Sequence, residues 1–483
     1  MVKVSILFLF IYLGVGVSNK SYAASNEVEI LAKINNAYGG ELLMQAKSVR
    51  ILDKYKQFYS DQGISADFTE VFKYHIDLTI DFEQKRKSLT VWESKDRGNR
   101  LIQTIVDETD GTEYNVLHAQ FEKNDAIQYK QLGSLSIQTH DTLLARLLLL
   151  HPEKTKRIEN AYFRGVTHHK LSMSLEDWPE LTLWIDSHTG LITKVSRPYR
   201  NGDKIEYVFS NYAQKQGVTF AKDFQLNIAG EPYRISTSKD IEINPLFPNV
   251  AGGAENYSKR GKTIDTRSMV VKSFSHGAYY VGQGHRFSLF YDAGDYFYGV
   301  GGNSQLKSRF EALQQYLNTN KPLKFQVATH HHSDHLEGMI DAYRLGATFI
   351  TVDAHIPAIQ KAIGSTIDKK RVVTVKQQSH FEQGNFQVFN IPSSHSNQNL
   401  MVYLPKSKLM FTADHFSSDL VSDLPNVDKG TVILHKAIKT LDIDVNKFVG
   451  AHGSRVLSKN ELARVSASFK KELCPNNLRV CID

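Results

Sequence analysis

Four histidines and one aspartate stand within seven residues, 329–335, in the C-terminal half of the chain: His330, His331, His332, Asp334 and His335. The apolar run 325–328 before them predicts a buried strand, and residues 336–343 predict the start of a helix. Several imidazoles and a carboxylate are costly to bury together unless a cation binds them. Imidazole nitrogen and carboxylate oxygen are ligand atoms for zinc and related metals. We therefore predict a metal site, in preference to a solvated, histidine-rich loop.

Three more residues of metal-binding type lie farther along the chain, each where an apolar, strand-like run gives way to a loop. His395 follows the run 386–391, Asp414 ends the run from residue 409, and His452 follows the run from residue 448. Such loop ends meet at one edge of a sheet, which is where α/β proteins usually build their sites. We therefore expect these residues to converge on the histidine cluster.

In this order the motifs resemble those of the metallo-β-lactamase superfamily: His330-x-His332-x-Asp334-His335, a lone His395, the strand-terminal Asp414 and the pair His452-Gly453. The resemblance covers roughly residues 267–483. It implies an α/β fold, an αββα sandwich, with a dinuclear metal site between its two sheets. It also implies the ligands: His330, His332 and His395 for the first metal, Asp334, His335 and His452 for the second, and Asp414 as the bridge.

This resemblance implies two divalent metal ions, zinc first, with iron or manganese as alternatives. Two such ions sharing a carboxylate can share a water and lower its pKa enough to give hydroxide near neutral pH. The enzyme expected is a dinuclear metallo-hydrolase whose metal-bridging hydroxide attacks its substrate. Asp334 is the expected catalytic residue, as ligand and orienter of the nucleophile. His415 is a second catalytic candidate, with an ordinary turn residue as the alternative, and His331 has no assigned role.

The residue at the bridging position narrows the substrate class. Asp414 stands where some β-lactamases place a cysteine ligand, and another β-lactamase class lacks this acid, so both classes are disfavoured. The pattern is more similar to hydroxyacylglutathione hydrolases, lactonases and related enzymes, which implies a small-molecule ester, thioester or lactone. Two alternatives stay open. One is a mononuclear-iron oxygenase of the same fold, and the other is an apolar-ligand-binding protein with a structural metal site.

The N-terminus has the pattern of a secretory signal peptide over residues 1–23. Lys3 precedes the apolar run 4–17, and Ser21-Tyr22-Ala23 supplies the small residues of a cleavage site after Ala23. The run is shorter than the ~20 residues that a membrane-spanning helix needs, so an uncleaved anchor is disfavoured. We therefore expect a periplasmic or secreted protein with no stable membrane anchor after cleavage.

The length and charge of the chain limit the number of domains and the kinds of partner that we expect. A chain of 483 residues favours two domains behind the leader. The formal charge is +7, of which Lys3 and Lys20 of the leader contribute two, and no dense basic block occurs, so no nucleic acid partner is expected. The linker-like composition of residues 244–262 places the domain boundary there. The predicted domains are 24–262 and 263–483.

Residues 24–262 predict an α+β domain with a large antiparallel sheet. Residues 72–82 alternate apolar and polar side chains, and residues 181–195 predict a hairpin. The pattern weakly resembles the curved-sheet domains of periplasmic lipoprotein-carrier proteins, which implies an apolar ligand, with a docking role as the alternative. Asp141 is the candidate N-cap of a helix over 141–150. His75 and the pair His168-His169 are expected at the surface.

The only two cysteines, Cys474 and Cys481, lie close together at the C-terminus. In an oxidising compartment they favour a local disulfide over two free thiols. Neither is expected to be catalytic, since both sit in a short polar tail.

Overall fold

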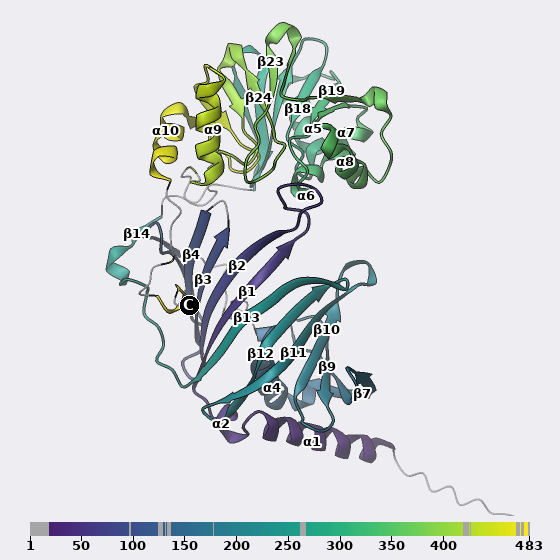
Figure 1. The fold of residues 1–483 in the computed structure, drawn as a ribbon, viewed down its shortest axis with the longest axis vertical. Coiled ribbons are helices and arrows are strands. Elements are labelled where there is room, and N and C mark those ends of the chain that lie inside the picture. The colour runs from purple at the N-terminus through teal and green to yellow at the C-terminus, as the bar shows by residue number, and fades with distance from the viewer. Residues whose placement is uncertain are drawn as a thin grey trace, which may run out of the picture. The chain divides into compact units, whose positions relative to one another are not determined.

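The computed structural model describes residues 19–95, 98–123, 129–130, 132, 137–176, 178–260, 267–418, 425, 427–469, 474 and 478–481 (Figure 1). The apolar run of the predicted signal peptide lies outside these residues. The chain's own contacts divide it into two units. The first comprises residues 1–49, 133–232 and 241–244, and the second 50–132, 233–240 and 245–483. The single domain boundary near residue 262 stays a prediction.

The first unit combines helices with an antiparallel sheet. Its helices are α1 (Asn19–Ala37), α2 (Glu41–Met44) and α4 (Asp141–Leu150), and its complete strands are β7 (Thr155–Phe163), β8 (Val166–Met173), β9 (Leu181–Asp186), β10 (Ile192–Pro198), β11 (Lys204–Lys215) and β12 (Val218–Ile228). The strands lie in the order β12-β11-β10-β9-β8-β7. β9 and β10 pair as the predicted hairpin, with Leu183 opposite Val195. α1 ends before Gly39, whose φ of 101° suits a glycine. No described helix is both long and apolar enough to cross a membrane.

Two expectations for this unit are wrong. Asp141 is not the N-cap of α4, because His140 holds that position. Its buried carboxylate instead accepts a hydrogen bond from the Tyr38 hydroxyl at 3.0 Å and from the Ala221 amide. His168 is not at the surface: it is buried, and its Nε2 lies 2.8 Å from the Thr193 hydroxyl. Both polar groups are buried with partners, as buried polar groups usually are.

The second unit begins with the other strands of the predicted antiparallel sheet. They are β1 (Ser48–Tyr59), β2 (Glu70–Asp81), β3 (Arg86–Lys95), β4 (Gly98–Val106), β5 (Gly111–Asn115), β6 (Gln120–Lys123), β13 (Glu231–Ile243) and β14 (Ser258–Lys259), in the order β14-β6-β5-β4-β3-β2-β1-β13. The boundary between the units falls within β1 and within β13. Part of the expected linker forms β14, which pairs in parallel with β6.

The polar face of β2 is covered, contrary to expectation. Asp77 is buried and accepts a hydrogen bond of 2.7 Å from the Arg50 guanidinium. The ring of His75 packs 4.6 Å from that of Trp92, and its Nδ1 lies 2.8 Å from the carbonyl oxygen of Val480. His75 is therefore a partly buried contact of the C-terminal tail. Cys474 and Cys481 in that tail form a disulfide, as favoured by the sequence.

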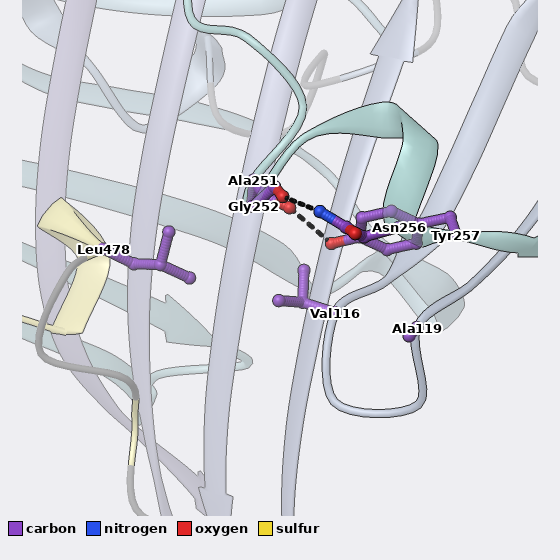
Figure 2. A pocket seen from close by; sticks show the side chains of 7 residues that line it. All are labelled: Val116, Ala119, Ala251, Gly252, Asn256, Tyr257 and Leu478. Atoms are coloured by element: carbon purple, nitrogen blue, oxygen red, sulfur yellow. Dashed lines mark hydrogen bonds between the residues drawn. The ribbon is translucent and has the colours of Figure 1, made fainter.

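A pocket of about 250 Å³ lies beside these strands (Figure 2). It is lined by Val116, Ala119, Ala251, Gly252, Asn256, Tyr257 and Leu478. The Tyr257 hydroxyl donates to the Ala251 carbonyl at 2.7 Å, and the Asn256 side-chain amide donates to the Gly252 carbonyl at 2.6 Å. These polar groups therefore form hydrogen bonds with other residues that line the pocket. Small-molecule sites usually measure roughly 300–1,000 Å³. The apolar ligand implied by the N-terminal pattern stays a prediction.

The rest of the second unit contains two sheets and their helices (Figure 1). The first sheet has the order β15 (Val270–Phe274), β16 (Ala278–Gln283), β17 (Arg286–Asp292), β18 (Phe297–Val300), β19 (Leu323–Val327), β20 (Thr348–Thr351) and β21 (Val372–Thr374). The second has the order β22 (Gln378–Phe381), β23 (Phe386–Asn390), β24 (Leu400–Leu404), β25 (Leu409–Phe411), β26 (Lys447–Val449) and β27 (Leu457–Ser458). The helices are α5 (Leu306–Leu317), α6 (Ser333–Leu336), α7 (Met339–Arg344), α8 (Ile356–Ile363), α9 (Lys429–Thr440) and α10 (Lys459–Ser468).

Three apolar cores order these elements into four layers. The central core joins the facing sides of the two sheets, for example through Tyr280 and Val402. The neighbouring residues Val281 and Met401 point the other way, because successive side chains of a strand alternate between its faces. Val281 shares an outer core with α5, α7 and α8, and Met401 shares another with α9 and α10. The predicted αββα sandwich is confirmed.

Candidate metal centre

Strand ends of both sheets supply the candidate metal-binding side chains. β19 ends at Val327 and leads into the histidine run, whose residue His332 is the N-cap of the four-residue helix α6. Asp334 and His335 lie on that helix. His395 follows β23, Asp414 follows β25 and His452 follows β26, so the predicted strand-to-loop placement holds for each. These loops bring all seven residues predicted as ligands into two adjoining groups.

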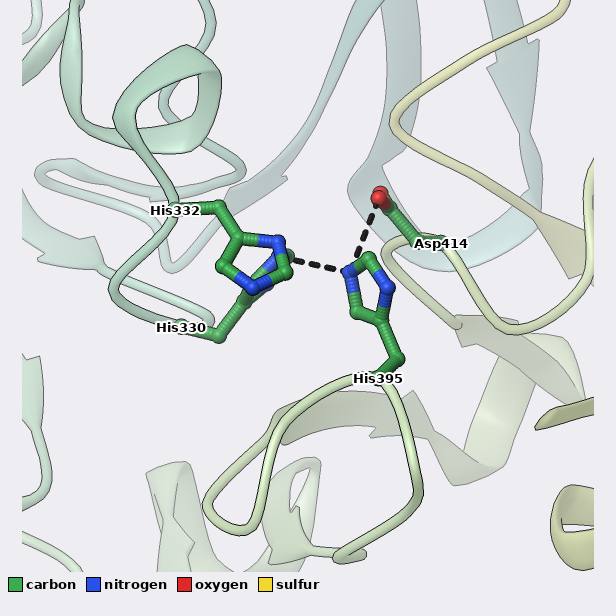
Figure 3. A group of neighbouring side chains, drawn as sticks. All are labelled: His330, His332, His395 and Asp414. Atoms are coloured by element: carbon green, nitrogen blue, oxygen red, sulfur yellow. Dashed lines mark hydrogen bonds and ion pairs between the residues drawn. The ribbon is translucent and has the colours of Figure 1, made fainter. Parts of the chain in front are cut away.

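The first group consists of His330, His332, His395 and Asp414 (Figure 3). All three imidazoles are buried. Nε2 of His395 lies 3.0 Å from Nε2 of His330 and 3.1 Å from Oδ2 of Asp414, which places His395 between them. Three histidines and a carboxylate thus point donor atoms at one small volume.

The second group consists of Asp334, His335 and His452. Nε2 of His452 lies 3.3 Å from Nε2 of His335 and 3.3 Å from Oδ2 of Asp334. Nε2 of His335 lies 3.4 Å from the same Asp334 oxygen. Two imidazole nitrogens and one carboxylate oxygen therefore converge here as well.

Asp414 links the two groups through its two carboxylate oxygens. Oδ2 faces His395 of the first group at 3.1 Å. Oδ1 faces the second group, 2.8 Å from Nε2 of His335 and 3.4 Å from Nε2 of His452. A carboxylate held in this way can give one oxygen to each of two ions.

The spacing and surroundings of the donor atoms fit metal ions. Ligand nitrogens about 2.0–2.1 Å from a tetrahedral zinc stand about 3.3 Å from each other, close to the separations in both groups. Metal-binding histidines usually engage their second ring nitrogen with a carbonyl or another polar group. Nδ1 of His330 lies 3.2 Å from the Thr329 hydroxyl, and Nδ1 of His452 lies 3.1 Å from the His285 carbonyl. The residues present fit divalent metal binding.

The charged and titratable groups of the site shift one another's pKa values. Burial and the neighbouring imidazoles, His335 first, hold the pKa of His330 well below its usual value, so the ring is neutral. Burial acts to raise the pKa of Asp414, but imidazoles led by His335 outweigh it and keep that pKa well below its usual value. Burial acts to lower the pKa of His452, but the carboxylates of Asp414 and Asp334 raise it to about 9. The carboxylates of Asp334 and Asp414 thus favour positive charge beside them.

One side of the centre is open to solvent. The side chains of Asp334 and His452 are 43% and 29% exposed, whereas those of His335 and His395 are 0% and 4% exposed. Structural zinc sites are closed by four protein ligands, while catalytic sites keep an open position. The second group therefore has the access that a substrate and a water need.

His415 lies in the interior behind this open side. Its side chain is buried, and its ring centre is 6.1 Å from that of His395. Nδ1 accepts a hydrogen bond of 2.9 Å from the side-chain amide of Asn399. The structure thus places His415 against a predicted ligand, and its catalytic role stays a prediction.

A loop far away in the sequence also reaches the centre, which the sequence did not indicate. It connects β1 to β2, and its Gly63 carbonyl lies 2.9 Å from Nε2 of both His331 and His332. Gln62 of the same loop donates to Oδ1 of Asp334 at 3.1 Å. The residues around Gly63 have the composition of an ordinary hairpin turn, so no pattern in them marks this contact. His331, which had no assigned role, is one of its partners.

Two observations identify the fold: the αββα arrangement of layers, and the chain order in which the seven candidate ligands follow the strand ends. The C-terminal part of the chain has the metallo-β-lactamase fold. Solved structures similar to the chain include metallo-β-lactamases from Hirschia baltica (17% identity, TM-score 0.33, covering 42% of this chain and 97% of that one) and Pontibacter korlensis (19%, 0.33, 41% and 98%). Another is a mono-zinc metallo-β-lactamase from Pseudomonas aeruginosa (13%, 0.34, 42% and 96%).

No family model matches the sequence, and no curated protein matches it.

Proposed function

We propose that this chain is an exported, metal-dependent hydrolase that holds two divalent ions and cleaves an ester, thioester or lactone bond of a small molecule. Zinc is the first candidate for both ions, with iron or manganese as alternatives. The observation that carries the proposal is the position of Asp414, whose oxygens face His395 at 3.1 Å and His335 at 2.8 Å. Because one carboxylate serves both groups, the seven residues make one dinuclear centre.

When bound, two such ions lower the pKa of a shared water enough to give a nucleophile near neutral pH, and they draw electrons from the substrate's carbonyl oxygen. The side chains of the chain have separate tasks. The buried histidines of the first group would hold one ion away from solvent. Asp334 lies on the open side of the centre, with Oδ2 facing His335 and His452. There it would orient the nucleophile. Asp414 keeps the two positions at a fixed separation.

Two alternatives explain less of the geometry. A mononuclear-iron oxygenase needs one ligand group and leaves Asp334, His335 and His452 without a purpose. A structural metal site needs closed coordination, whereas Asp334 is 43% exposed. The signal-peptide pattern supports export, and the acid at position 414 supports a substrate other than a β-lactam.

The test is a substrate panel with metal-replete protein: lactones, thioesters, aryl esters, phosphodiesters, sulfate esters and β-lactams. Asp334→Asn should lower kcat/KM on the best substrate by at least about 100-fold, since it removes a ligand and the orienter of the nucleophile. Asp442→Asn is the matched control, because Asp442 is an exposed aspartate beyond α9. Undiminished hydrolysis by Asp334→Asn would contradict the mechanism, and a β-lactam as best substrate would contradict the substrate class.

A further inference from the structure

The loop between β1 and β2, residues 60–69, contacts the segments that carry the candidate ligands. Asp61 accepts a hydrogen bond from the hydroxyl of Ser333, the first residue of α6. The Ile64 carbonyl accepts a hydrogen bond of 2.8 Å from the amide of Asn397, in the ligand-bearing loop after β23. The loop is therefore attached to two of the four ligand-bearing segments, by a side-chain hydrogen bond to α6 and a backbone hydrogen bond to the loop after β23.

The Gly63 carbonyl acts on two adjacent histidines. Its oxygen lies 2.9 Å from Nε2 of His331 and 2.9 Å from Nε2 of His332. A carbonyl oxygen has two lone pairs and can only accept, so both nitrogens must carry the hydrogen. With its hydrogen on Nε2, neutral His332 keeps the lone pair on Nδ1, and only a nitrogen with a lone pair binds a metal. The carbonyl thereby selects the metal-binding nitrogen of His332.

Gln62 makes an equivalent selection at the second group. Its side-chain amide donates to Oδ1 of Asp334 at 3.1 Å. The other oxygen, Oδ2, lies 3.4 Å from Nε2 of His335 and 3.3 Å from Nε2 of His452. A carboxylate can rotate to exchange its two oxygens, and the amide of Gln62 opposes this rotation.

The loop has a fixed internal shape that presents these groups. A Cβ atom added at Gly63 would stand 1.6 Å from the Phe68 carbonyl oxygen, so only glycine fits there. The Phe68 amide donates to the Ser65 carbonyl at 3.0 Å, and the Ser65 hydroxyl donates to Asp67 at 2.7 Å. Because these bonds close the loop on itself, the Gly63 carbonyl keeps its direction without help from the metal.

We propose that loop 60–69 is a positioning element of the dinuclear centre: Gly63 sets the metal-binding nitrogen of His332, and Gln62 sets the metal-binding oxygen of Asp334. This inference rests on the proposed function and deepens it. One loop then orients a ligand of each ion, and the two contacts come from adjacent residues. Metal binding at both positions therefore depends on loop 60–69, although none of the seven candidate ligands lies in that loop.

Metal titration tests the two contacts separately. Co²⁺ is added to metal-free protein, and the affinity of each site is read from equilibrium dialysis and from the visible absorption of the bound ion. Loss of such an outer contact typically weakens metal binding by roughly 10–100-fold. Gln62→Ala should weaken the second ion's binding by this factor and leave the first unchanged. Gly63→Ala should weaken the first and shift its absorption bands. Gln84→Ala is the matched control, since Gln84 is an exposed glutamine in the turn between β2 and β3, outside the loop.

The outcomes separate this inference from the proposed function. Two ions bound by wild-type protein, with unchanged affinities in Gln62→Ala, would overturn the positioning role and leave the hydrolase proposal standing. A wild-type chain that binds no divalent ion would overturn both. Thermal unfolding of each variant is measured in parallel. If Gly63→Ala fails to fold, Gln62→Ala decides alone, because a merely structural role would lower both affinities or neither.

Discussion

The carbonyl oxygen of Gly63 lies 2.9 Å from Nε2 of His332, although 269 residues separate the two in sequence. His332 belongs to the motif of candidate metal ligands, and Gly63 belongs to a hairpin of the preceding sheet. The contact holds the imidazole of His332, a candidate metal ligand, against a turn of the preceding sheet. This hydrogen bond also connects residues 50–132 to the candidate metal centre. Residues 50–132 and the centre belong to the same unit, the second.

Metal removal should destabilise the second unit. Without cations, the centre holds a partly buried carboxylate among several buried imidazoles. Ions that bind only the folded chain stabilise it by mass action. With free metal at 1,000 times its dissociation constant, one ion contributes about 4 kcal/mol. Calorimetry with and without a chelator should show a lower unfolding temperature in the chelator, restored by Zn²⁺ but not by Mg²⁺. An unchanged transition would contradict metal binding by the folded state.

His415→Leu should act on stability more than on substrate binding. His415 is buried, and its loss leaves the Asn399 amide without this acceptor, which typically costs about 1–3 kcal/mol. KM should stay unchanged, because the side chain is not on the open side of the centre. Denaturant unfolding and steady-state kinetics measure the two effects, with His435→Leu on α9 as control. A raised KM at unchanged stability would instead indicate a substrate-facing residue.

Lys87 should make stability rise with pH. Its Nζ donates to the Tyr129 carbonyl at 2.7 Å, and burial lowers its pKa from 10.5 to about 8. Between these values the unfolded chain holds more protons than the folded one, so the free energy of unfolding increases with pH. The contribution is at most about 3–4 kcal/mol. It should be absent in Lys87→Met and present in Lys56→Met, an exposed control on β1. Parallel pH curves for wild type and Lys87→Met would contradict the assignment.

The disulfide between Cys474 and Cys481 should stabilise the tail without serving catalysis. Its cysteines are seven residues apart, and closure of so short a loop contributes about 2–3 kcal/mol in the chain-entropy account. Replacing both cysteines with serine should lower stability by up to that amount and weaken the contact between His75 and Val480. Hydrolysis should be retained. Loss of turnover in a folded double variant would show that the tail takes part in the reaction.

The convergence of the seven candidate ligands could be predicted because it depends on local patterns, whereas the αββα sandwich was implied by the resemblance of those motifs to the metallo-β-lactamase superfamily. Each candidate ligand stands at the end of an apolar run, and His330, His332, Asp334 and His335 share one short motif. The wrong expectations, Asp141, His75 and His168, concern polar groups whose partners come from distant segments. An alternating strand does not reveal that the tail covers its polar face. The contacts of Gly63 and Gln62 were missed for the same reason.

The number of divalent ions bound per chain, measured by elemental analysis of metal-replete protein, tests the dinuclear centre most directly. Asp414→Ala removes the carboxylate that faces both groups, and Asp295→Ala, at an exposed aspartate between β17 and β18, is its control. The proposed centre predicts two ions per chain and active hydrolysis for wild type and control, with loss of at least one ion and of turnover in Asp414→Ala. Two ions and full turnover in Asp414→Ala, or no bound ion in wild type, would contradict it.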